Sequence, residues 1–372
     1  MKTALISGGG IAGSALAHWL RRNGYAPTVV ERAPGPRRGG QAIDVRGVAL
    51  DVLARMGLLD EARELRTHMR GMSVLDADGT EVHRSTEYAF SSGRLDGEDI
   101  ELMREDLVRL LHRATRDGVE YVFGDSVTAL AETADGDGVR VEFGSGASRT
   151  FDLVVGADGL HSGVRRLAFG PEERFTRHLG QYLSVFTAEN FLGLEDWQVW
   201  LRDGAAGFAA MSVPGNEELR IAFGFESAPL EGDHRDGEWL REMIVERMGT
   251  LRWPETPRMV KAAREAPDFF CDAMAQIHLD RWSRGRVTLV GDAGYCASPL
   301  SGQGTSLALV GAYVLADALG RAGGDQEAGL ARYEERMRPY VGLNQALAQT
   351  DRKGPAPEEE VDRAKNAIAL DA

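Results

Sequence analysis

The stretch that decides the fold is TALISGGGIAGSALAHWLRRNGYAPTVVE, residues 3–31. Residues 3–7 are a short apolar run typical of a buried strand, and the apolar positions of residues 11–22 recur with the period of a helix. The pair Asn-Gly at 23–24 predicts the end of that helix, and residues 28–30 predict a second strand. The chain is therefore expected to begin with a βαβ unit of the Rossmann type.

Three glycines, Gly8, Gly10 and Gly13, stand between the first strand and the helix with the spacing G-x-G-x-x-G. The first permits a tight turn, the second lets the backbone approach a pyrophosphate at the helix N-terminus, and the third allows close packing of helix and strand. Glu31 ends the second strand 18 residues after Gly13, where a carboxylate can accept hydrogen bonds from ribose hydroxyls. The pattern predicts a dinucleotide site, does not distinguish FAD from NAD, and leaves a glycine-rich turn without ligand as the alternative.

Composition and charge narrow the possible partners. The 372 residues carry 57 acidic and 43 basic side chains, a net charge of −14, without a basic block, which argues against nucleic acid or an anionic membrane as the main partner. The two cysteines, Cys271 and Cys296, make neither a disulfide framework nor a metal cluster, so no metal is expected. The glycines at 8–10 argue against a signal peptide, and the apolar stretch 307–316 is too short to cross a bilayer. A cytoplasmic protein is expected.

The later segments predict a second, inserted unit. The predicted elements are a helix-rich stretch over 47–69, a hairpin over 72–83, a helix over 103–117, strands within 127–156, an antiparallel sheet over 180–226, a buried strand over 287–290, a long apolar helix over 303–320, and a polar, mostly helical last forty residues interrupted at 354–357. Because a buried strand returns after the middle sheet, the nucleotide-binding domain is expected to be discontinuous. The predicted bounds are 1–70, 98–172 and 280–335 for that domain, 71–97 and 173–279 for a substrate-binding sheet domain, and 336–372 for a C-terminal helical segment.

Two further motifs follow buried strands. Asp158 and Gly159 come after the strand at 153–155, and Gly291 and Asp292 come after the strand at 287–290. A carboxylate at the end of the later strand can reach a sugar-alcohol chain, and the next turn opens a helix whose first amide groups can face an electron-rich ring. Taken singly, each motif is also compatible with an ordinary strand-to-turn connection. The residues of that turn are Pro299, Gly302 and Gly304.

Together the three motifs, in this order and spacing over nearly the whole chain, resemble the group A flavoprotein monooxygenases, the para-hydroxybenzoate hydroxylase-like family. In its short length the chain is most similar to the tetracycline-inactivating oxygenases and to natural-product tailoring hydroxylases. The fold class that the resemblance implies is α/β: a Rossmann-type FAD-binding domain with an inserted antiparallel-sheet substrate domain and a C-terminal helix.

The resemblance also implies which residues hold the cofactor and which face the flavin. The segment at 39–46 resembles the one that runs beside the flavin ring, so Asp44 and Arg46 become catalytic candidates, although the flavin itself carries the chemistry. The implied cofactor-binding residues are Gly8, Gly10, Ile11, Ala12, Gly13, Glu31 and Arg32 at the ADP half, Arg104 in contact with the cofactor, Asp158 and Gly159 for FAD and transient NAD(P)H binding together, Gly291 and Asp292 at the ribityl chain, and Pro299, Gly302 and Gly304 along the isoalloxazine.

The implied activity is that of an FAD-dependent monooxygenase, which uses NAD(P)H as co-substrate and O2 through a flavin C4a-hydroperoxide. The substrate class is a bulky aromatic, polyketide or antibiotic-like small molecule, in biosynthesis or resistance, and the expected assembly is a monomer or weak dimer. Such chemistry needs a pocket that excludes water. The aromatic and apolar residues of the middle sheet are the predicted pocket: Trp200, Phe208, Met211, Phe223 and Phe225.

Several alternatives stay open at this point. An FAD-dependent reductase of the same fold and a non-catalytic flavin-binding or drug-binding protein both fit the cofactor motifs. A dehydrogenase that uses NAD would need only the first motif and would leave Gly291 and Asp292 unexplained. The family usually has Ala-His after the Gly-Asp-Ala run, whereas this chain has Gly294 and Tyr295, which argues against a mechanism that needs that histidine.

Overall fold

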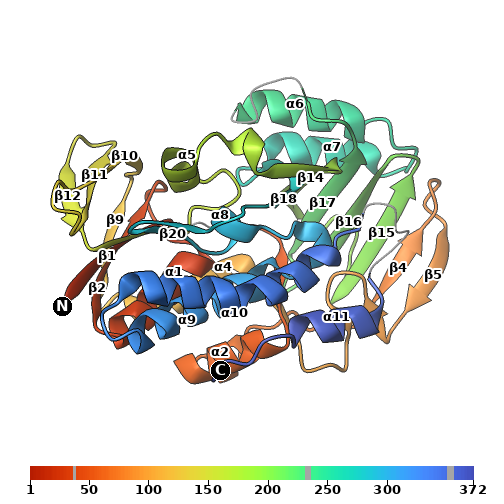
Figure 1. Cartoon of the computed structure of the whole chain (residues 1–372). Helices are drawn as coiled ribbons and strands as arrows, with labels where there is room; N and C mark the ends of the chain where they lie inside the picture. The colour runs from red at the N-terminus through yellow and green to blue at the C-terminus, as the bar shows by residue number, and fades with distance from the viewer. Residues whose placement is uncertain (37–38, 231–235, 350–355) are drawn as a thin grey trace.

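The computed structural model describes residues 1–36, 39–230, 236–349 and 356–372, and it places two large sheets next to one another (Figure 1). The six-stranded sheet lies toward the N-terminus, and the long helices α9 (Gly304–Arg321) and α10 (Gln326–Ala346) run beneath it. The seven-stranded sheet lies on the other side, with helices α6 (Gly237–Met248) and α7 (Thr256–Glu265) above it. No helix in the described ranges has the length and apolar character needed to span a bilayer.

The six-stranded sheet confirms the predicted Rossmann-type architecture. Strands β20, β13, β1, β2 and β9 pair in parallel, and only β19 is antiparallel to its neighbour. Helix α1 (Ile11–Arg22) has the predicted bounds, and its apolar face is buried with β1 and α9 in one core. In sheet order the strands are β19 (Ser283–Arg284), β20 (Val287–Leu289), β13 (Leu153–Gly156), β1 (Lys2–Ser7), β2 (Tyr25–Glu31) and β9 (Glu120–Phe123).

The seven-stranded sheet confirms the predicted antiparallel unit and enlarges it. The predicted hairpin is present as β4 and β5, but β4 also pairs in parallel with β15, which joins a segment from early in the chain to the middle sheet. Strand β18 was not predicted. In sheet order the strands are β18 (Phe270–Ile277), β14 (Thr176–Glu189), β17 (Glu218–Glu226), β16 (Ala206–Ser212), β15 (Trp197–Asp203), β4 (Gly71–Leu75) and β5 (Glu81–Ser85).

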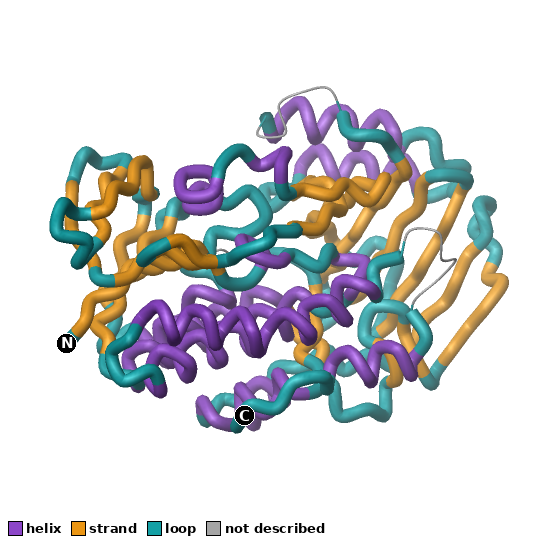
Figure 2. Tube along the Cα trace, in the orientation of Figure 1, coloured by secondary structure: helices purple, strands orange, loops and turns teal. Residues whose placement is uncertain are grey.

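Helices α6 and α7 cover one face of the seven-stranded sheet, as the tube in Figure 2 shows, and the sequence analysis did not anticipate them. Alternate residues of each strand point toward these helices. Phe208, Phe223 and Phe225 are buried there, in a cluster with Ile244 of α6 and Met259 of α7. We call this side of the sheet the outer face, and the side bearing the alternate residues the inner face.

The remaining elements connect and cover the two sheets. The predicted boundary at 336 falls inside α10, which continues through Pro339, and residues 354 and 355 of the predicted interruption lie outside the described ranges. These elements are the strands β3 (Ala42–Val45), β6 (Tyr88–Ala89), β7 (Gly93–Arg94), β8 (Ile100–Met103), β10 (Val127–Glu132), β11 (Val139–Phe143) and β12 (Ser148–Phe151), and the helices α2 (Val48–Met56), α3 (Leu59–Glu64), α4 (Arg104–Thr115), α5 (Gly163–Phe169), α8 (Asp292–Tyr295) and α11 (Glu358–Lys365).

Candidate functional site

The glycine-rich turn after β1 has the shape that a pyrophosphate site requires. Gly8 has φ +108°, and a Cβ atom there would collide with the carbonyl oxygen of Ala157, while one at Gly13 would collide with the carbonyl oxygen of Gly8. At Gly10 a Cβ atom would meet nothing within 4 Å, so this position is open. Gly10 precedes the first turn of α1, which includes Ile11 and Ala12, and no side chain caps that turn. The free N–H groups of an uncapped helix start favour an anion.

The acidic residue that ends β2 is held in place next to this turn. Glu31 Oε2 accepts a hydrogen bond of 2.8 Å from Gly9 N, and Oε1 accepts one of 2.8 Å from Ala33 N. The neighbouring Arg32 is exposed. Two backbone donors thus fix the orientation of the Glu31 carboxylate beside the open turn, where it can receive further hydroxyl donors.

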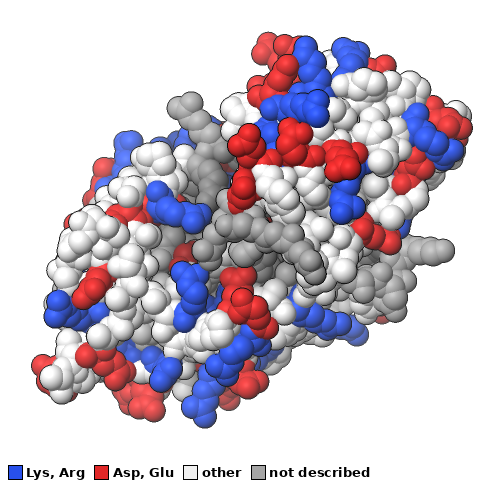
Figure 3. All heavy atoms as spheres, turned by 90° about the horizontal axis from the view of Figure 1, so that it is seen from above, with Lys and Arg blue, Asp and Glu red and all other residues white. Residues whose placement is uncertain are grey.

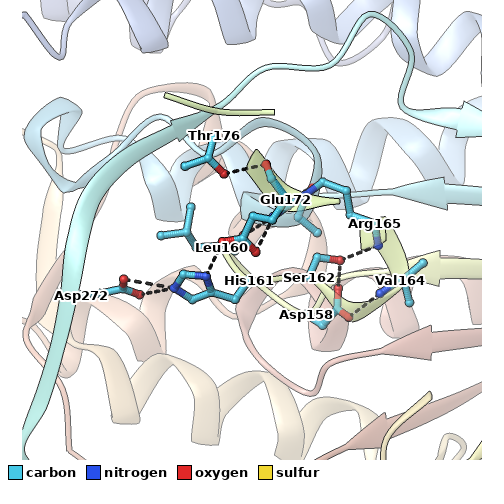
Figure 4. A network of polar contacts seen from close by, with 10 residues as sticks. Asp158, Leu160, His161, Ser162, Val164, Arg165, Glu172, Thr176 and Asp272 are labelled. Carbon is cyan, nitrogen blue, oxygen red and sulfur yellow. Dashed lines mark hydrogen bonds and ion pairs between the residues drawn. The ribbon is translucent and has the colours of Figure 1, made fainter. Parts of the chain in front are cut away.

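The Asp-Gly loop after β13 is the centre of a polar network (Figure 4). Asp158 accepts hydrogen bonds from Ser162 Oγ and from Val164 N at 3.1 Å, and burial raises its pKa. Gly159 has φ +82° and open space where a side chain would stand. The fully buried Arg165 donates from Nη1 to the carbonyl oxygen of Ala293 at 3.0 Å, so this network ties the Asp-Gly loop to the residue after Asp292.

One histidine of the same loop connects it to the seven-stranded sheet. His161 Nδ1 lies 2.7 Å from Glu172 Oε1, and Nε2 lies 3.0 Å from Asp272 Oδ2 on β18 (Figure 4). The hydrogen bonds to Asp272 and Glu172 raise the pKa of His161 to about 9, so the ring is an imidazolium at neutral pH. The sequence analysis did not single out this histidine, because its two partners are 11 and 111 residues away.

The third motif meets the first. A Cβ atom at Gly291 would lie 3.0 Å from Ala12 Cβ in α1, so only a glycine allows this approach. Asp292 begins α8 with its side chain exposed, and desolvation by the surrounding protein raises its pKa. A Cβ atom at Gly304, the first residue of α9, would lie 3.9 Å from Asp292 Oδ1. Strand β20 and the turn before α9 thereby bring the predicted ribityl and ring-binding residues together.

The predicted catalytic candidates lie at the same turn. A Cβ atom at Gly302, which follows the turn Pro299–Ser301, would lie 3.7 Å from Arg46 Cζ. Arg46 also donates from its backbone N to Ser306 Oγ at 3.0 Å and from Nη2 to Asp44 Oδ2 at 2.9 Å. Arg104 begins α4, and its side chain lies against Gly40, because a Cβ atom there would be 3.3 Å from Arg104 Cδ. Segments 40–46, 104 and 302–306 therefore converge.

The residues present fit an elongated dinucleotide with a polar ring system. Three groups at the convergence are buried and lack a hydrogen-bond partner within the described part of the chain: Asp44 Oδ1, Arg46 Nε and both side-chain polar atoms of Gln303. Buried polar atoms are normally paired, so such orphans mark places where a ligand can bond. A Cβ atom at Gly10 or at Gly159 would meet nothing within 4 Å, so both positions leave room for a ligand.

Comparison with known proteins identifies the ligand class. A family model described as an FAD binding domain matches residues 1–346. The chain belongs to the FAD-binding monooxygenase family. It is 38% identical to a flavin-dependent monooxygenase of Legionella longbeachae over 341 residues, which cover 92% of this chain and 86% of that protein. The predicted family, fold class, FAD cofactor and enzyme class are confirmed.

Two solved structures have a similar overall fold. The crystal structure of tetracycline destructase Tet(51) matches with a TM-score of 0.88 and 32% identity and covers 99% of both chains. Klebsiella pneumoniae HpxO, crystallised with FAD and uric acid, matches with a TM-score of 0.71 and 25% identity over 98% of this chain and 91% of that one. The chain with the three motifs described above would hold FAD at those motifs. The bound cofactor would supply the redox chemistry and the activation of O2.

We call the converging residues Gly40, Arg46, Arg104 and 302–306 the flavin cradle. The inner face of the seven-stranded sheet points toward it. Arg220 of β17 donates from Nε to the carbonyl oxygen of Gly40 at 3.0 Å, and Gln198 of β15 donates from Nε2 to Ser91 Oγ at 2.5 Å. Leu183 of β14 packs in one cluster with Leu300 of the ring-binding turn. Three strands of the sheet thus contact segments that surround the predicted ring site.

The structure divides the predicted pocket residues between the two faces. Trp200 and Met211 alternate with the outer-face residues of their strands and so lie on the inner face, where the ring of Phe90 is 5.3 Å from that of Trp200. Phe208, Phe223 and Phe225 lie in the outer-face core instead. That placement does not support a role for these three in the pocket, and the reason is the period of two along a strand, which a count of aromatic residues ignores.

The sequence analysis missed four polar residues near the cradle: Ser91, Glu101, Gln198 and Arg220. Glu101 offered a signal, because it interrupts the apolar strand Ile-Glu-Leu-Met at 100–103, and it is buried. A carboxylate in a buried strand is rare unless it is paired or functional. The other three become recognisable only when β15, β17 and the loop at 91 are placed together.

Proposed function

We propose that the protein uses NAD(P)H and O2 to oxygenate a broad, flat, polycyclic aromatic or polyketide-like molecule bound between the inner face of the sheet and the flavin cradle. The observation that carries the proposal is a strip of small residues on the two central strands. The cross-strand pairs Ala209–Ala222 and Gly207–Gly224 occupy the inner face, whereas the pair Phe208–Phe223 occupies the outer one. All four small residues are partly exposed in the middle of the sheet.

The strip suits a flat ring system for a physical reason. Side chains on central strands normally fill the space above a sheet. This floor of two alanines and two glycines projects little side-chain volume into that space. The four residues lie between Trp200 of β15 and Leu183 of β14, with Met211 at one end of the strip, and Leu183 packs in one cluster with Leu300 of the ring-binding turn. A polycyclic ligand laid on this floor would bury much apolar area and would exclude water from the flavin ring.

The names of the structural neighbours support the size of the ligand. Tet(51) is named as a tetracycline destructase, and tetracycline has four fused rings. Uric acid, which is bound in HpxO, has two. The chain is more similar to Tet(51), in sequence and in structure, and it has a small-residue floor. We therefore place its substrate among polyphenolic compounds with three or more fused rings.

The experiment is a screen of tetracyclines, anthraquinones and smaller phenols for stimulated NADPH and NADH oxidation, in air and under argon. The proposal predicts stimulation by the polycyclic compounds in air, with O2 consumed in step with the nicotinamide. Stimulation that continues under argon with substrate reduction would favour a reductase, and a flavin-loaded protein that no compound stimulates would favour a binding protein.

A variant links the activity to the floor. Ala222→Phe fills the strip while keeping an apolar side chain, so it should raise KM for a polycyclic substrate about tenfold or more, because the ligand loses its flat contact area. Val82→Phe, on the exposed strand β5, is the matched control and should leave KM unchanged. An unaltered KM in Ala222→Phe would remove the strip from the binding site.

A further inference from the structure

Two buried carboxyl groups stand opposite each other beside the flavin cradle. Strands β3 and β8 form a short antiparallel pair in which Asp44 is the direct partner of Glu101, so both side chains lie on one side of the pair. The Asp44 side chain is 11% exposed and Glu101 is 6% exposed. Two carboxyl groups at this spacing in a buried place do not both ionise unless nearby cations compensate them.

The charges around the pair leave one proton to be held. The charged groups that face Asp44 are Arg46, Glu101 and Asp99. Asp99 Oδ2 is bound to Lys365 Nζ at 2.9 Å, which leaves the single guanidinium of Arg46 between the two remaining carboxyls. In the described part of the chain, one guanidinium thus faces two acids, so an uncharged acid is the favourable state for one of them.

Hydrogen bonds assign the charge to Glu101. Its Oε1 accepts from Thr67 Oγ1 at 2.6 Å, and its Oε2 accepts from Ser91 Oγ. Both oxygens of Glu101 are therefore acceptors, which suits an ionised carboxylate. Asp44 differs, because only Oδ2 has a partner, Arg46, while Oδ1 is buried without one among the residues described. The proton belongs on Asp44 Oδ1, because the other three oxygens accept hydrogen bonds and this one accepts none from the residues that the structure describes.

The position of Asp44 relates this proton to the reaction. Arg46, its partner, lies against Gly302 and Ser306 at the start of α9, where the predicted ring site is. Serine 91 joins Glu101 to Gln198, and Gln198 Oε1 accepts from Trp200 Nε1 at 3.1 Å on the inner face. The pair thus lies between the cradle and the proposed substrate floor.

We propose that Asp44 is the proton-holding group of this active site, and that Glu101 and Arg46 are positioning residues that keep its proton in place; the inference rests on the proposed oxygenation. That reaction combines substrate, O2, NAD(P)H and one proton to give oxygenated substrate, NAD(P)+ and water. Asp44 would lose its proton to the oxygen atom that leaves as water, and it would regain a proton from solvent in each turnover.

Burial raises the pKa of both acids, and at Glu101 the hydrogen bonds from Ser91 and Thr67 oppose that rise. Burial raises the pKa of Asp44 to about 7, with the charge of Glu101 acting in the same direction and that of Arg46 against it. An acid with a pKa near the working pH both gives up and regains a proton readily. Removing the Glu101 charge should lower the pKa of Asp44, because one like charge is gone.

The test follows the carboxyl group itself, independently of turnover. Infrared difference spectra of the FAD-loaded protein between pH 5 and 9 should show the C=O stretch of a protonated carboxyl disappearing around pH 7. The band should be absent in Asp44→Asn, and its midpoint should move to lower pH in Glu101→Gln. Asp60→Asn, a fully exposed acid in α3, is the control and should leave the band unchanged.

Turnover supplies the second readout. Asp44→Asn should retain FAD, as its visible spectrum reports, and should lose about 10²-fold in kcat with a flattened pH profile. A titrating band that persists in Asp44→Asn overturns the proposal. A midpoint that does not move in Glu101→Gln also overturns it, and Glu101→Gln carries the test by itself if Asp44→Asn fails to fold. Since the infrared titration needs no substrate, a failure of the oxygenation itself would leave this result intact and appear only in the screen.

Discussion

At the scale of single residues, the site depends on a few side chains whose surroundings are set far away in sequence. Asp292, which begins α8 and lies close to the start of α9, is the clearest case. Its predicted role is to hold the ribityl chain of FAD, and the three orphaned polar groups nearby show where the ring would bond. The residue that orders the loop on the opposite side, His161, works through charge instead of cofactor contact.

Asp292→Ala removes a carboxylate acceptor from the predicted ribityl site. Hydrogen bonds to a charged group are worth about 1.5–3 kcal/mol, so the Kd for FAD should rise roughly tenfold to a hundredfold. The flavin absorbance of the purified protein and a titration of the stripped protein with FAD measure this. Asp60→Ala should bind FAD like the parent protein, and an Asp292→Ala protein that stays fully loaded would rule out the role.

His161→Gln tests the ion pairs between the Asp-Gly loop and β18. The pKa of His161 is raised to about 9 in the folded protein, above the value of about 6.5 in the unfolded chain, so its stabilisation is fully present below pH 6.5 and is lost as the pH rises through 9. The ring is partly exposed, so we expect about 1 kcal/mol after solvent screening. Urea unfolding should show the parent more stable than His161→Gln at pH 6 and equally stable at pH 10. A gap that does not change with pH would contradict the charge argument.

At the scale of elements, strong local periodicity made most of the fold predictable. Helix α1 and strands β1 and β2 have the expected places because an apolar strand, a glycine turn and an amphipathic helix are all encoded within thirty residues. The parallel pairing of β4 with β15 was not predictable, because its partners are more than a hundred residues apart and each strand alone reads as half of a hairpin. Helices α6 and α7 were missed although local signals were present: Asp236 is a typical N-cap for α6, and the apolar residues of α7 recur with helical spacing.

The site followed the same rule. Glycines and acids within a motif, such as Gly8 and Asp292, were recognised from the sequence, and the structure brings them together. The division of aromatic residues between the two faces was not recognised, because it depends on which alternate residues of β16 and β17 face the helices α6 and α7. The Asp44–Glu101 partnership likewise depends on the register of β3 and β8, which no local pattern states.

Phe223→Ala tests the two-faced sheet. The Phe223 side chain is fully buried against α6 and α7, so its truncation should lower the free energy of unfolding by about 3–5 kcal/mol while KM for a polycyclic substrate stays the same in the folded fraction. Ala222→Phe, one residue away, should show the opposite pattern, with a raised KM and nearly unchanged stability. Denaturant unfolding and initial rates on both variants check this, and a raised KM in Phe223→Ala would put the outer face into the pocket.

At the scale of the whole molecule, the proposed function gives one sheet to the cofactor and the other to the substrate. Strands β15, β17 and β18 make polar contacts with segments on the side of the predicted cofactor site, at Ser91, Gly40 and His161 respectively. On the surface shown in Figure 3, acidic and basic side chains are interspersed, which agrees with a small molecule as the partner and not a polyanion.

The measurement that tests the central claim most directly is turnover of a stimulating polycyclic compound under 18O2, followed by mass spectrometry of the product. The account predicts one labelled oxygen atom in each product molecule and one NAD(P)H consumed for it. A product that carries no label, or that takes its oxygen from labelled water, would contradict oxygenation of the substrate by O2.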